Sequence, residues 1–338
     1  MGEPSVVVAA VDLGASSGRV VIGEGGRSGF RLREVYRFTN TPIRRRGALR
    51  WDAQLLRGGV LEGLRRAAAD AGHLDAVSVD GWAVDFGLLD TAGELIADPV
   101  HYRDSRTLQP FADLTGGLIS GVDPAQLYAT TGIAARPFNT VFQLMAASAS
   151  GDLSPARHAL LLPDLMTYWL SGAMGTELTN ASTTQLLDPR TMTWASAFAE
   201  RLGIPFELFP PIWRAGEIAG RITAQVAALL GTDTTTQLVV GPSHDTAAAI
   251  AAVPAQDDDF AFVCTGTWAL VGLELNQLDA GGPAAGFDDS LRHAVGRGKA
   301  RVLDIDQRHG SWQVGRDRGE RVSIDGATGR LPLALALL

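Results

Sequence analysis

The 338-residue sequence contains one cysteine, Cys264, and this scarcity excludes two kinds of structure. A single thiol cannot form an intrachain disulfide, and it cannot build a cysteine-based metal site. Long hydrophobic runs and a basic N-terminal segment are lacking too, since the apolar stretch at residues 6–11 is too short for a signal sequence or a membrane span. We therefore expect a cytoplasmic protein with no membrane partner.

Positive charge is in deficit, with 29 Lys and Arg against 37 Asp and Glu and a net charge of -8. Because binding to a phosphate backbone relies on clustered Lys and Arg, this balance argues against a nucleic-acid partner. The arginine run at residues 44–46 is interpreted as a solvated turn. A content of 46% hydrophobic and 20% charged residues is typical of a globular protein, and the length suggests about two domains.

An apolar run ends at Asp12, turns through Gly14-Ala15-Ser16-Ser17-Gly18 and resumes at residues 20–22, which predicts a β-hairpin. The two glycines permit left-handed backbone and close approach, while the loop N–H groups and the two serine hydroxyls can converge on phosphate oxygens. Asp12 is placed to orient a hydrated Mg²⁺ ion on the same phosphates. An ordinary hairpin with a polar tip is the alternative for this loop taken alone.

The first ninety residues predict an α/β arrangement. The expected elements are strands at residues 5–12, 19–23, 30–38, 76–80 and 83–89, with a helix between the N-cap Asp52 and Gly72. The first three strands form an antiparallel meander. Strands that lead into a helix and return to strands indicate an α/β domain.

The rest of the chain to residue 273 is expected to be mostly helical, followed by a second hairpin. The expected elements are helices at 140–149, 163–170 and 194–202, a strand at 238–240, a helix at 247–253, a polar linker at 254–259, and strands at 260–264 and 268–273. The acidic segment Ser243-His244-Asp245-Thr246 precedes the last helix. Two polar hairpins on either side of an acidic helix start predict a two-lobed nucleotide clamp that holds phosphates between its lobes.

Motifs spread over residues 6–274 resemble the FGGY carbohydrate kinases, a branch of the actin-like ATPase (ribonuclease H-like) fold. They are DLGASSGR at 12–19, YRFTN at 36–40, WAVDFGLLD at 82–90, YRDSRT at 102–107, PFNT at 137–140 with Gln143-Leu144, LPDL at 162–165, TNASTTQL at 179–186, SHDT at 243–246 and TGTW at 265–268. Within the family, the first loop and the block at 179–185 resemble the rhamnulokinase branch.

This resemblance implies transfer of the γ-phosphoryl group of ATP, with Mg²⁺, to the 1-hydroxyl of L-rhamnulose. Asp245 matches the catalytic base of the family and would accept the proton of the sugar hydroxyl as the new bond forms. His244 is the second choice for that base. For the segment 243–246 taken alone, a helix N-cap remains the alternative.

The resemblance also assigns binding positions. ATP contacts fall on Ala15, Ser16, Ser17, Gly18, Arg19, Gly266 and Thr267, and sugar contacts fall on Trp82, Ala83, His244, Asp245 and Thr246. Arg19 is expected to contact phosphate, with a solvated strand residue as the alternative. Trp82 offers an aromatic face to a deoxyketose and is equally suited to a core. Gly81 stands where a small hydroxylated residue is expected, and a helix cap and a helix surface position account for Asn139 and Gln143.

The resemblance ends after Leu275. The last 63 residues contain 10 glycines and 8 arginines and show little periodicity. The substrate segment, the Asn-(Val/Ile)-Met-Gly helix and the adenine site expected of the family are not readable there. We expect residues 1–253 to form a complete N-terminal lobe, 254–275 to begin a second lobe, and 276–338 to form a poorly ordered, divergent tail.

Two origins for this ending remain open. Residues 306–310 can be back-translated through codons that read Asn-Val-Met-Gly one frame over, which indicates a frameshift near residue 276; a genuine divergent tail is the alternative. With one complete lobe, the chain is expected to bind nucleotide weakly and to turn over slowly. An inactive remnant, a sugar-binding module and a regulatory actin-like domain are the alternative functions.

Overall fold

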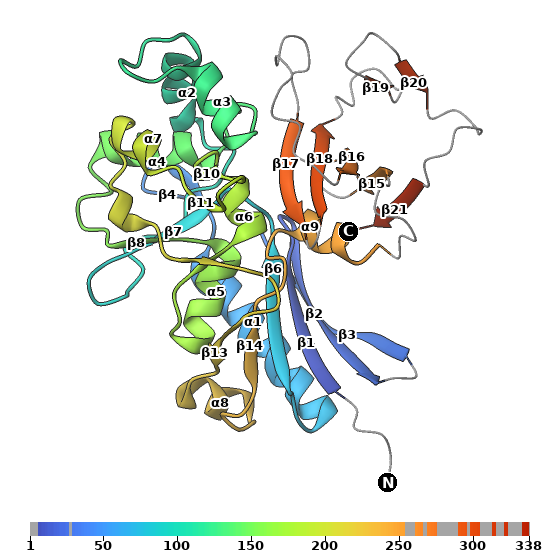
Figure 1. Ribbon diagram of the computed structural model, residues 1–338. Helices are drawn as coiled ribbons and strands as arrows, with labels where there is room; N and C mark the ends of the chain where they lie inside the picture. The colour runs from blue at the N-terminus through green and yellow to red at the C-terminus, as the bar shows by residue number, and fades with distance from the viewer. Residues whose placement is uncertain are drawn as a thin grey trace.

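The computed structural model describes residues 6–26 and 29–253, together with the backbone of several strands beyond residue 260. At its centre lies a six-stranded mixed sheet in the order β13-β14-β6-β1-β2-β3 (Figure 1). Strands β1 (Val6–Leu13), β2 (Ser17–Gly26) and β3 (Gly29–Thr39) pair antiparallel. The predicted three-stranded meander is therefore confirmed.

The remaining strands of this sheet arrive through helical crossovers. Helix α1 (Ala53–Ala71) leads to β6 (Ala76–Gly81), which pairs parallel to β1. On the far side of β6, β14 (Gln237–Val239) also runs parallel to it, and β13 (Ile218–Arg221) closes the edge antiparallel to β14. Parallel strands joined by helices confirm the predicted α/β class.

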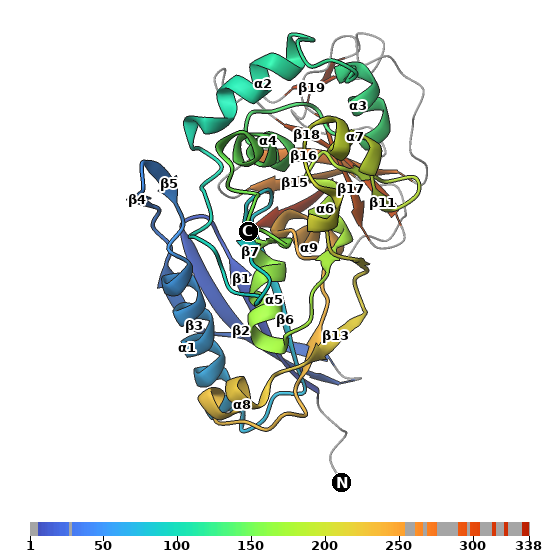
Figure 2. The same ribbon diagram turned by 90° about the vertical axis from the view of Figure 1, so that its left-hand side faces the viewer.

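The two faces of the sheet differ in what covers them. The buried alternate residues of β1 are Val7, Ala9, Val11 and Leu13, which pack with helices α1, α5 (Leu162–Ser171) and α8 (Ala224–Leu230). These helices lie on the same side of the sheet (Figure 2). Because side chains alternate along a strand, Asp12 lies on the face opposite the helices.

A second hydrophobic core lies beyond the end of the sheet, at the top of Figure 1. It is built around β7 (Phe86–Leu89), β8 (His158–Leu161), α2 (Leu108–Thr115), α3 (Pro124–Thr131), α4 (Thr140–Ser150) and α7 (Ser196–Arg201). The smaller elements are β4 (Ile43–Arg45), β5 (Ala48–Arg50), η1 (Ser105–Thr107), β9 (Thr176–Glu177), α6 (Leu178–Ser182), β10 (Leu187–Asp188), β11 (Thr193–Trp194), η2 (Phe206–Leu208) and β12 (Ile212–Trp213).

The three helices predicted in this region have different outcomes. The helices expected at 140–149 and 163–170 are confirmed as α4 and α5, and Gly172 ends α5 in the left-handed conformation. The helix expected at 194–202 begins later, at Ser196. Trp194 belongs instead to β11, where it pairs with Leu187 and donates its indole N–H to the carbonyl of Pro210 at 2.8 Å.

Helix α1 shows how local sequence sets element boundaries. The carboxylate of Asp52 accepts the N–H of Leu55 at 2.9 Å, and Gly72 ends the helix at φ 79°. We expect Asp52→Ala to lower the free energy of unfolding by about 1 kcal/mol, because it removes the N-cap acceptor. Urea denaturation measures this loss. Asp52→Asn keeps the acceptor and should stay near wild type, and equal losses in both variants would contradict the capping role.

Strands also follow residue 260. β15 (Ala261–Thr265) and β16 (Ala269–Leu275) pair antiparallel, which confirms the second predicted hairpin. They belong to a sheet of order β17-β18-β16-β15-β21, with β17 (Ser290–Val295), β18 (Gly298–Asp304) and β21 (Leu333–Leu337); β19 (Gln313–Gly315) pairs with β20 (Arg321–Ser323). Strands therefore pair beyond residue 275, where the sequence shows little of the alternation of apolar and polar residues that is typical of strands.

Some predictions lie beyond what the structure describes. The linker at 254–259 and the segment 306–310 that carries the frameshift argument are outside the described residues. The division of the chain at residues 253 and 275 stays a prediction.

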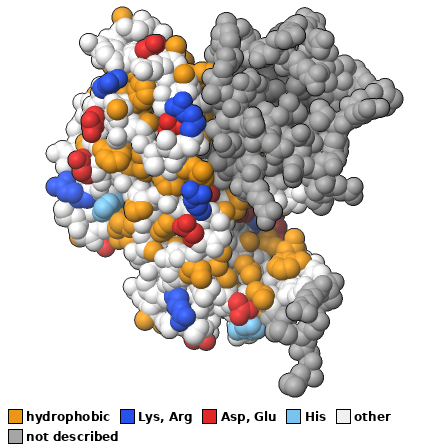
Figure 3. Space-filling model, in the orientation of Figure 1, with side chains coloured by type: hydrophobic (Ala, Val, Ile, Leu, Met, Phe, Trp, Pro, Cys, Tyr) orange, Lys and Arg blue, Asp and Glu red, His pale blue; other side chains and the backbone are white. Residues whose placement is uncertain are grey.

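Acidic and basic side chains are interspersed among hydrophobic ones on the face shown in Figure 3. The arginine run at 44–46 is exposed and ends in the turn between β4 and β5, where Arg46 and Gly47 have positive φ, as expected of a solvated turn. None of the described helices is both long and apolar enough to cross a membrane.

Candidate active site

The hairpin between β1 and β2 is fixed by backbone and side-chain hydrogen bonds. The N–H of Gly14 donates to the carbonyl of Ser17 at 3.0 Å across the turn. From the end of β3, Asn40 donates its backbone N–H to the carbonyl of Ser16 at 3.0 Å and its side-chain amide to the carbonyl of Gly14 at 3.1 Å. Asn40 therefore anchors the loop, a role that the sequence motif at 36–40 did not reveal.

The two loop glycines serve close packing rather than unusual backbone geometry. Neither Gly14 nor Gly18 has a positive φ, so the expectation of left-handed backbone is wrong. A Cβ on Gly14 would lie 2.7 Å from the carbonyl oxygen of Ser17, and one on Gly18 would lie 2.2 Å from the ring of Phe38. Any side chain at either position would force these neighbours apart, while close approach of the loop backbone to phosphate stays a prediction.

Two carboxylates lie side by side at the ends of β1 and β6. Asp12 and Asp80 are register partners on these parallel strands, and the Nε of Arg19 donates to Asp12 at 2.6 Å. Burial raises the pKa of Asp80 well above its ordinary value, and the negative charges of Asp12 and Asp245 raise it further. Sequence reasoning missed Asp80, although its strand ends in an acidic residue as the first strand does.

This arrangement is compatible with a Mg²⁺ ion held mainly by water and phosphate. Within the described ranges, no three His, Cys, Asp or Glu side chains gather closely enough to hold a metal ion by themselves. Mg²⁺ keeps several waters and commonly uses one or two carboxylates plus substrate phosphates. Asp12 is half-buried beside a second carboxyl, so the residues present fit the predicted ion.

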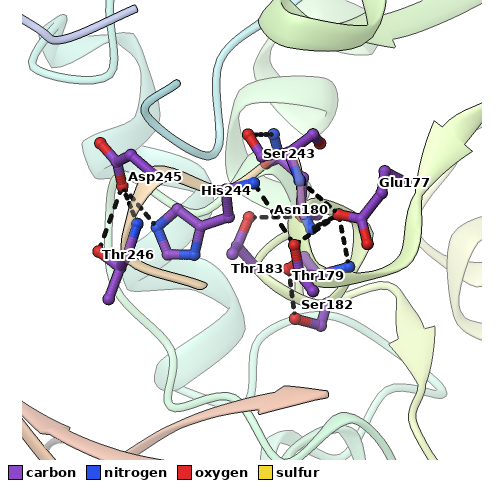
Figure 4. A network of polar contacts seen from close by, with 9 residues as sticks. All are labelled: Glu177, Thr179, Asn180, Ser182, Thr183, Ser243, His244, Asp245 and Thr246. Atoms are coloured by element: carbon purple, nitrogen blue, oxygen red, sulfur yellow. Dashed lines mark hydrogen bonds and ion pairs between the residues drawn. The ribbon is translucent and has the colours of Figure 1, made fainter. Parts of the chain in front are cut away.

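The acidic segment 243–246 connects β14 to α9 (Asp245–Ala251) (Figure 4). One carboxylate oxygen of Asp245 accepts the backbone N–H of Thr246 at 2.5 Å and its hydroxyl at 3.2 Å, and the Nε2 of His244 lies 3.3 Å from the same oxygen. The N-cap position is His244, whose side chain makes no capping bond. His244 therefore does not cap the helix through its side chain, while the Asp245 carboxylate does satisfy one N–H group of the first turn of α9.

The pKa of Asp245 is raised to about 7, mainly by burial, against hydrogen bonds from Thr246 that lower it. The charge of Asp12 raises it further. A carboxyl that titrates near neutrality can both accept a proton and release it, which is the property required of a general base at cellular pH. Its other oxygen faces away from these partners in Figure 4.

The backbone before Asp245 is joined directly to the end of β6. The N–H of Gly81 donates to the carbonyl of Ser243 at 3.0 Å, and Gly81 forms a parallel bridge with His244. A Cβ on Gly81 would lie 2.7 Å from the Cβ of Leu13. This contact explains a glycine where the sequence comparison expected a small hydroxylated residue.

Trp82 forms part of a buried aromatic stack. Its side chain is 6% exposed, its ring centroid lies 4.4 Å from that of Trp51, and Trp51 stacks on His101 at 4.2 Å. The indole N–H groups of both tryptophans donate to Asp85, at 3.1 Å from Trp82 and 2.6 Å from Trp51. The core interpretation thus describes Trp82, while sugar contact by Trp82 and the half-buried Ala83 stays a prediction.

The expected cap position of Asn139 is confirmed, whereas the expected surface position of Gln143 is wrong. Gln143 is 1% exposed, and its amide donates to the carboxylate of Asp85 at 2.9 Å and to the carbonyl of Val84 at 3.2 Å. Asn139 occupies the N-cap position of α4 but makes no side-chain capping bond; it donates to Ala134 at 3.3 Å. Both face inward because α4 packs against the segment 82–85, where Val84 holds a positive φ of 70°.

The other predicted ATP residues divide into two groups. Ala15, Ser16, Ser17, Gly18 and Arg19 lie together on the first hairpin, with Ser16 exposed. Gly266 and Thr267 lie outside the described residues, between β15 and β16. Cys264 on β15 is buried, and burial raises its thiol pKa to about 11, which makes it a poor nucleophile.

The sheet order, crossovers and hairpin define the actin-like ATPase fold. Solved structures of sugar kinases share it: ligand-bound xylulose kinase from Lactobacillus acidophilus superposes with a TM-score of 0.76 and 18% identity, covering 88% of this chain and 59% of that one. The chain belongs to the FGGY family of carbohydrate kinases, whose N-terminal domain matches residues 7–252.

Curated relatives refine the comparison. The rhamnulokinase of Yersinia pestis (bv. Antiqua, strain Angola) is 39% identical over 269 residues, and that of Enterococcus faecalis is 38% identical over 267 residues. Each alignment covers 78% of this chain and 53% of the relative. The chain therefore spans about half the length of the curated relatives it matches.

Proposed function

We propose that this chain carries the sugar site and catalytic base of an ATP-dependent kinase that phosphorylates L-rhamnulose on its 1-hydroxyl. The observation that carries the proposal is Asp245, a half-buried carboxyl with a pKa of about 7 on a loop joined to the end of β6. The similarity to rhamnulokinases over 78% of the chain supports the choice of sugar. ATP and this small sugar are the proposed partners, in the cytoplasm.

In this proposal, Asp245 accepts the proton of the attacking hydroxyl as the bond to phosphorus forms. The first hairpin, residues 15–19, binds ATP phosphates together with Gly266 and Thr267. Asp12 orients Mg²⁺ through water, and the ion supplies charge neutralisation on the phosphates when it is bound. Arg19 forms an ion pair with Asp12, so a phosphate contact from Arg19 would share its charge with that carboxylate.

The sugar is proposed to lie between the acidic loop and the aromatic stack. His244 and Thr246 flank the base, and both are buried. Trp82 and Ala83 follow the end of β6, which bonds to the same loop through Gly81. This shared anchor holds the proposed sugar-contact segments in a fixed relation to the base.

A second candidate function follows from the fact that this chain aligns with only about half the length of its rhamnulokinase relatives. A chain spanning 53% of a rhamnulokinase could bind sugar through residues 1–253 without completing phosphoryl transfer. Transfer requires both substrates to be positioned together, whereas sugar binding requires only the sugar site. A sugar-binding module is therefore the alternative to an active kinase.

A coupled ADP-release assay on the purified 338-residue chain tests the choice between them. We expect Mg²⁺- and ATP-dependent ADP release with L-rhamnulose, at least about tenfold faster than with D-xylulose, since mismatched hydroxyls leave buried polar groups unpaired. Calorimetric titration with L-rhamnulose runs in parallel. Sugar binding without ADP release would establish the binding module, and no response in either measurement would reject both functions.

A further inference from the structure

A buried carboxylate outside the proposed reaction chemistry holds the loop that carries Asp245. Glu177 ends β9, is 1% exposed and precedes α6. Its Oε2 atom accepts the backbone N–H of Ser243 at 2.9 Å, across 66 residues of sequence (Figure 4). A fully buried acidic side chain bonded to a loop backbone requires an explanation, because burying a carboxylate is costly.

The same oxygen also organises the start of α6. It accepts the N–H and hydroxyl of Thr179 at 2.9 and 2.5 Å and the N–H of Asn180 at 3.3 Å. These two residues then reach the loop themselves. The hydroxyl of Thr179 lies 3.4 Å from the N–H of His244, and the amide of Asn180 donates to the carbonyl of Ser243 at 3.4 Å.

The loop is thus held from two sides immediately before Asp245. Gly81 of β6 and the side-chain amide of Asn180 donate to the carbonyl of Ser243, while Glu177 accepts the N–H of Ser243 and Thr179 accepts the N–H of His244. Helix capping alone would need only the bonds to Thr179 and Asn180. The bond to Ser243 serves no capping purpose, and it fixes the backbone two residues before the proposed base.

We infer that Glu177 is a positioning residue, which sets the backbone of Ser243 and His244 and thereby the orientation of the Asp245 carboxylate toward the sugar hydroxyl. The inference rests on the proposed function for its effect on turnover. Its effect on the loop itself does not depend on that function. Removing the bond to Ser243 leaves a buried N–H without an acceptor and releases the loop.

Two substitutions separate positioning from capping. Glu177→Asp keeps a carboxylate suited to capping α6 but shortens the side chain by one methylene, so that it no longer reaches Ser243. Glu177→Gln keeps the length and an acceptor oxygen. Leu127→Ala is the control. It opens a cavity in the second hydrophobic core and so lowers stability without changing any contact of the loop.

We expect Glu177→Asp to lower kcat roughly 10- to 100-fold with an unchanged KM for ATP, since small misplacement of a catalytic group has effects of this size. Glu177→Gln should retain kcat within about fivefold of wild type, because acceptor and reach remain. Leu127→Ala should lower the melting temperature but leave kcat per folded molecule unchanged. A Glu177→Asp variant with wild-type kcat per folded molecule would overturn the inference.

Hydrogen exchange tests the same inference without turnover. The amide of Ser243 should exchange at least about tenfold faster in Glu177→Asp than in wild type, because its hydrogen bond to the Glu177 carboxylate is lost. Unchanged exchange at this amide overturns the positioning role, whatever the activity. Absence of turnover in wild type would defeat the proposed function alone, and the exchange rates would then decide the role of Glu177.

Discussion

Asp245→Asn is expected to lower kcat for L-rhamnulose phosphorylation roughly 10²- to 10⁴-fold, the usual contribution of a general base. The amide keeps the size of the carboxylate and an acceptor for the N–H of Thr246, but it cannot take the proton of the sugar hydroxyl. Steady-state ADP release measures the loss. Asp70→Asn, on the exposed surface of α1, makes the same charge change away from the site and should retain full activity.

The pH dependence of kcat provides a second test of Asp245 as the general base. Because the base acts when ionised and its pKa is about 7, kcat should fall as the pH decreases through 7. An ordinary aspartate would hold the rate constant down to about pH 4. A wild-type midpoint near 4, or an Asp245→Asn variant within threefold of wild type, would contradict the assignment.

As the pH rises through 7, kcat should increase, whereas the contribution of Asp245 to folding stability should decrease. The folded-state pKa of Asp245 is raised, so its stabilising contribution is complete below the unfolded value near 4 and is lost as the pH rises through 7. At pH 8, Asp245→Asn removes a half-buried negative charge and should raise the melting temperature. At pH 5 the carboxyl is neutral in the folded protein, and the difference should shrink. Scanning calorimetry at both pH values checks this sign.

Elements defined by local sequence were predictable. The first hairpin follows from alternating apolar residues around a Gly/Ser turn, and α1 follows from helical spacing between Asp52 and Gly72. Each of these signals acts within a few residues of chain. The candidate base was assigned from a motif match at the start of α9, and its role stays a prediction.

Contacts between distant segments were not predictable. Glu177 reaches Ser243 across 66 residues, and Gln143 reaches Asp85 across 58. No periodicity records such a pairing, and the helical position of Gln143 suggested a surface residue. The backbone of Gly14 was misjudged for a similar reason, since glycine permits both left-handed geometry and close packing, and only the neighbouring Ser17 decides between them.

The largest effect on stability is expected for Asp85→Ala. The Asp85 carboxylate is fully buried, which raises its pKa to about 6, and it accepts hydrogen bonds from four donors. These donors are the indoles of Trp51 and Trp82, the backbone N–H of Tyr102 and the amide of Gln143. A buried donor without an acceptor costs roughly 1–3 kcal/mol, so Asp85→Ala should lower the free energy of unfolding by at least about 3 kcal/mol.

Asp85→Asn supplies the matched control, because it separates the shape of the side chain from its acceptors. Its one carbonyl oxygen can serve the donors that now bond to Oδ2, but its NH₂ group would face the amide of Gln143. The side-chain amide of Gln143 cannot flip to present its oxygen instead, because its NH₂ group also donates to the carbonyls of Val84 and Phe138. We therefore expect an intermediate loss in urea denaturation at pH 8. A loss for Asp85→Ala no larger than that for the exposed Asp70→Ala would show that this carboxylate does not hold the aromatic stack.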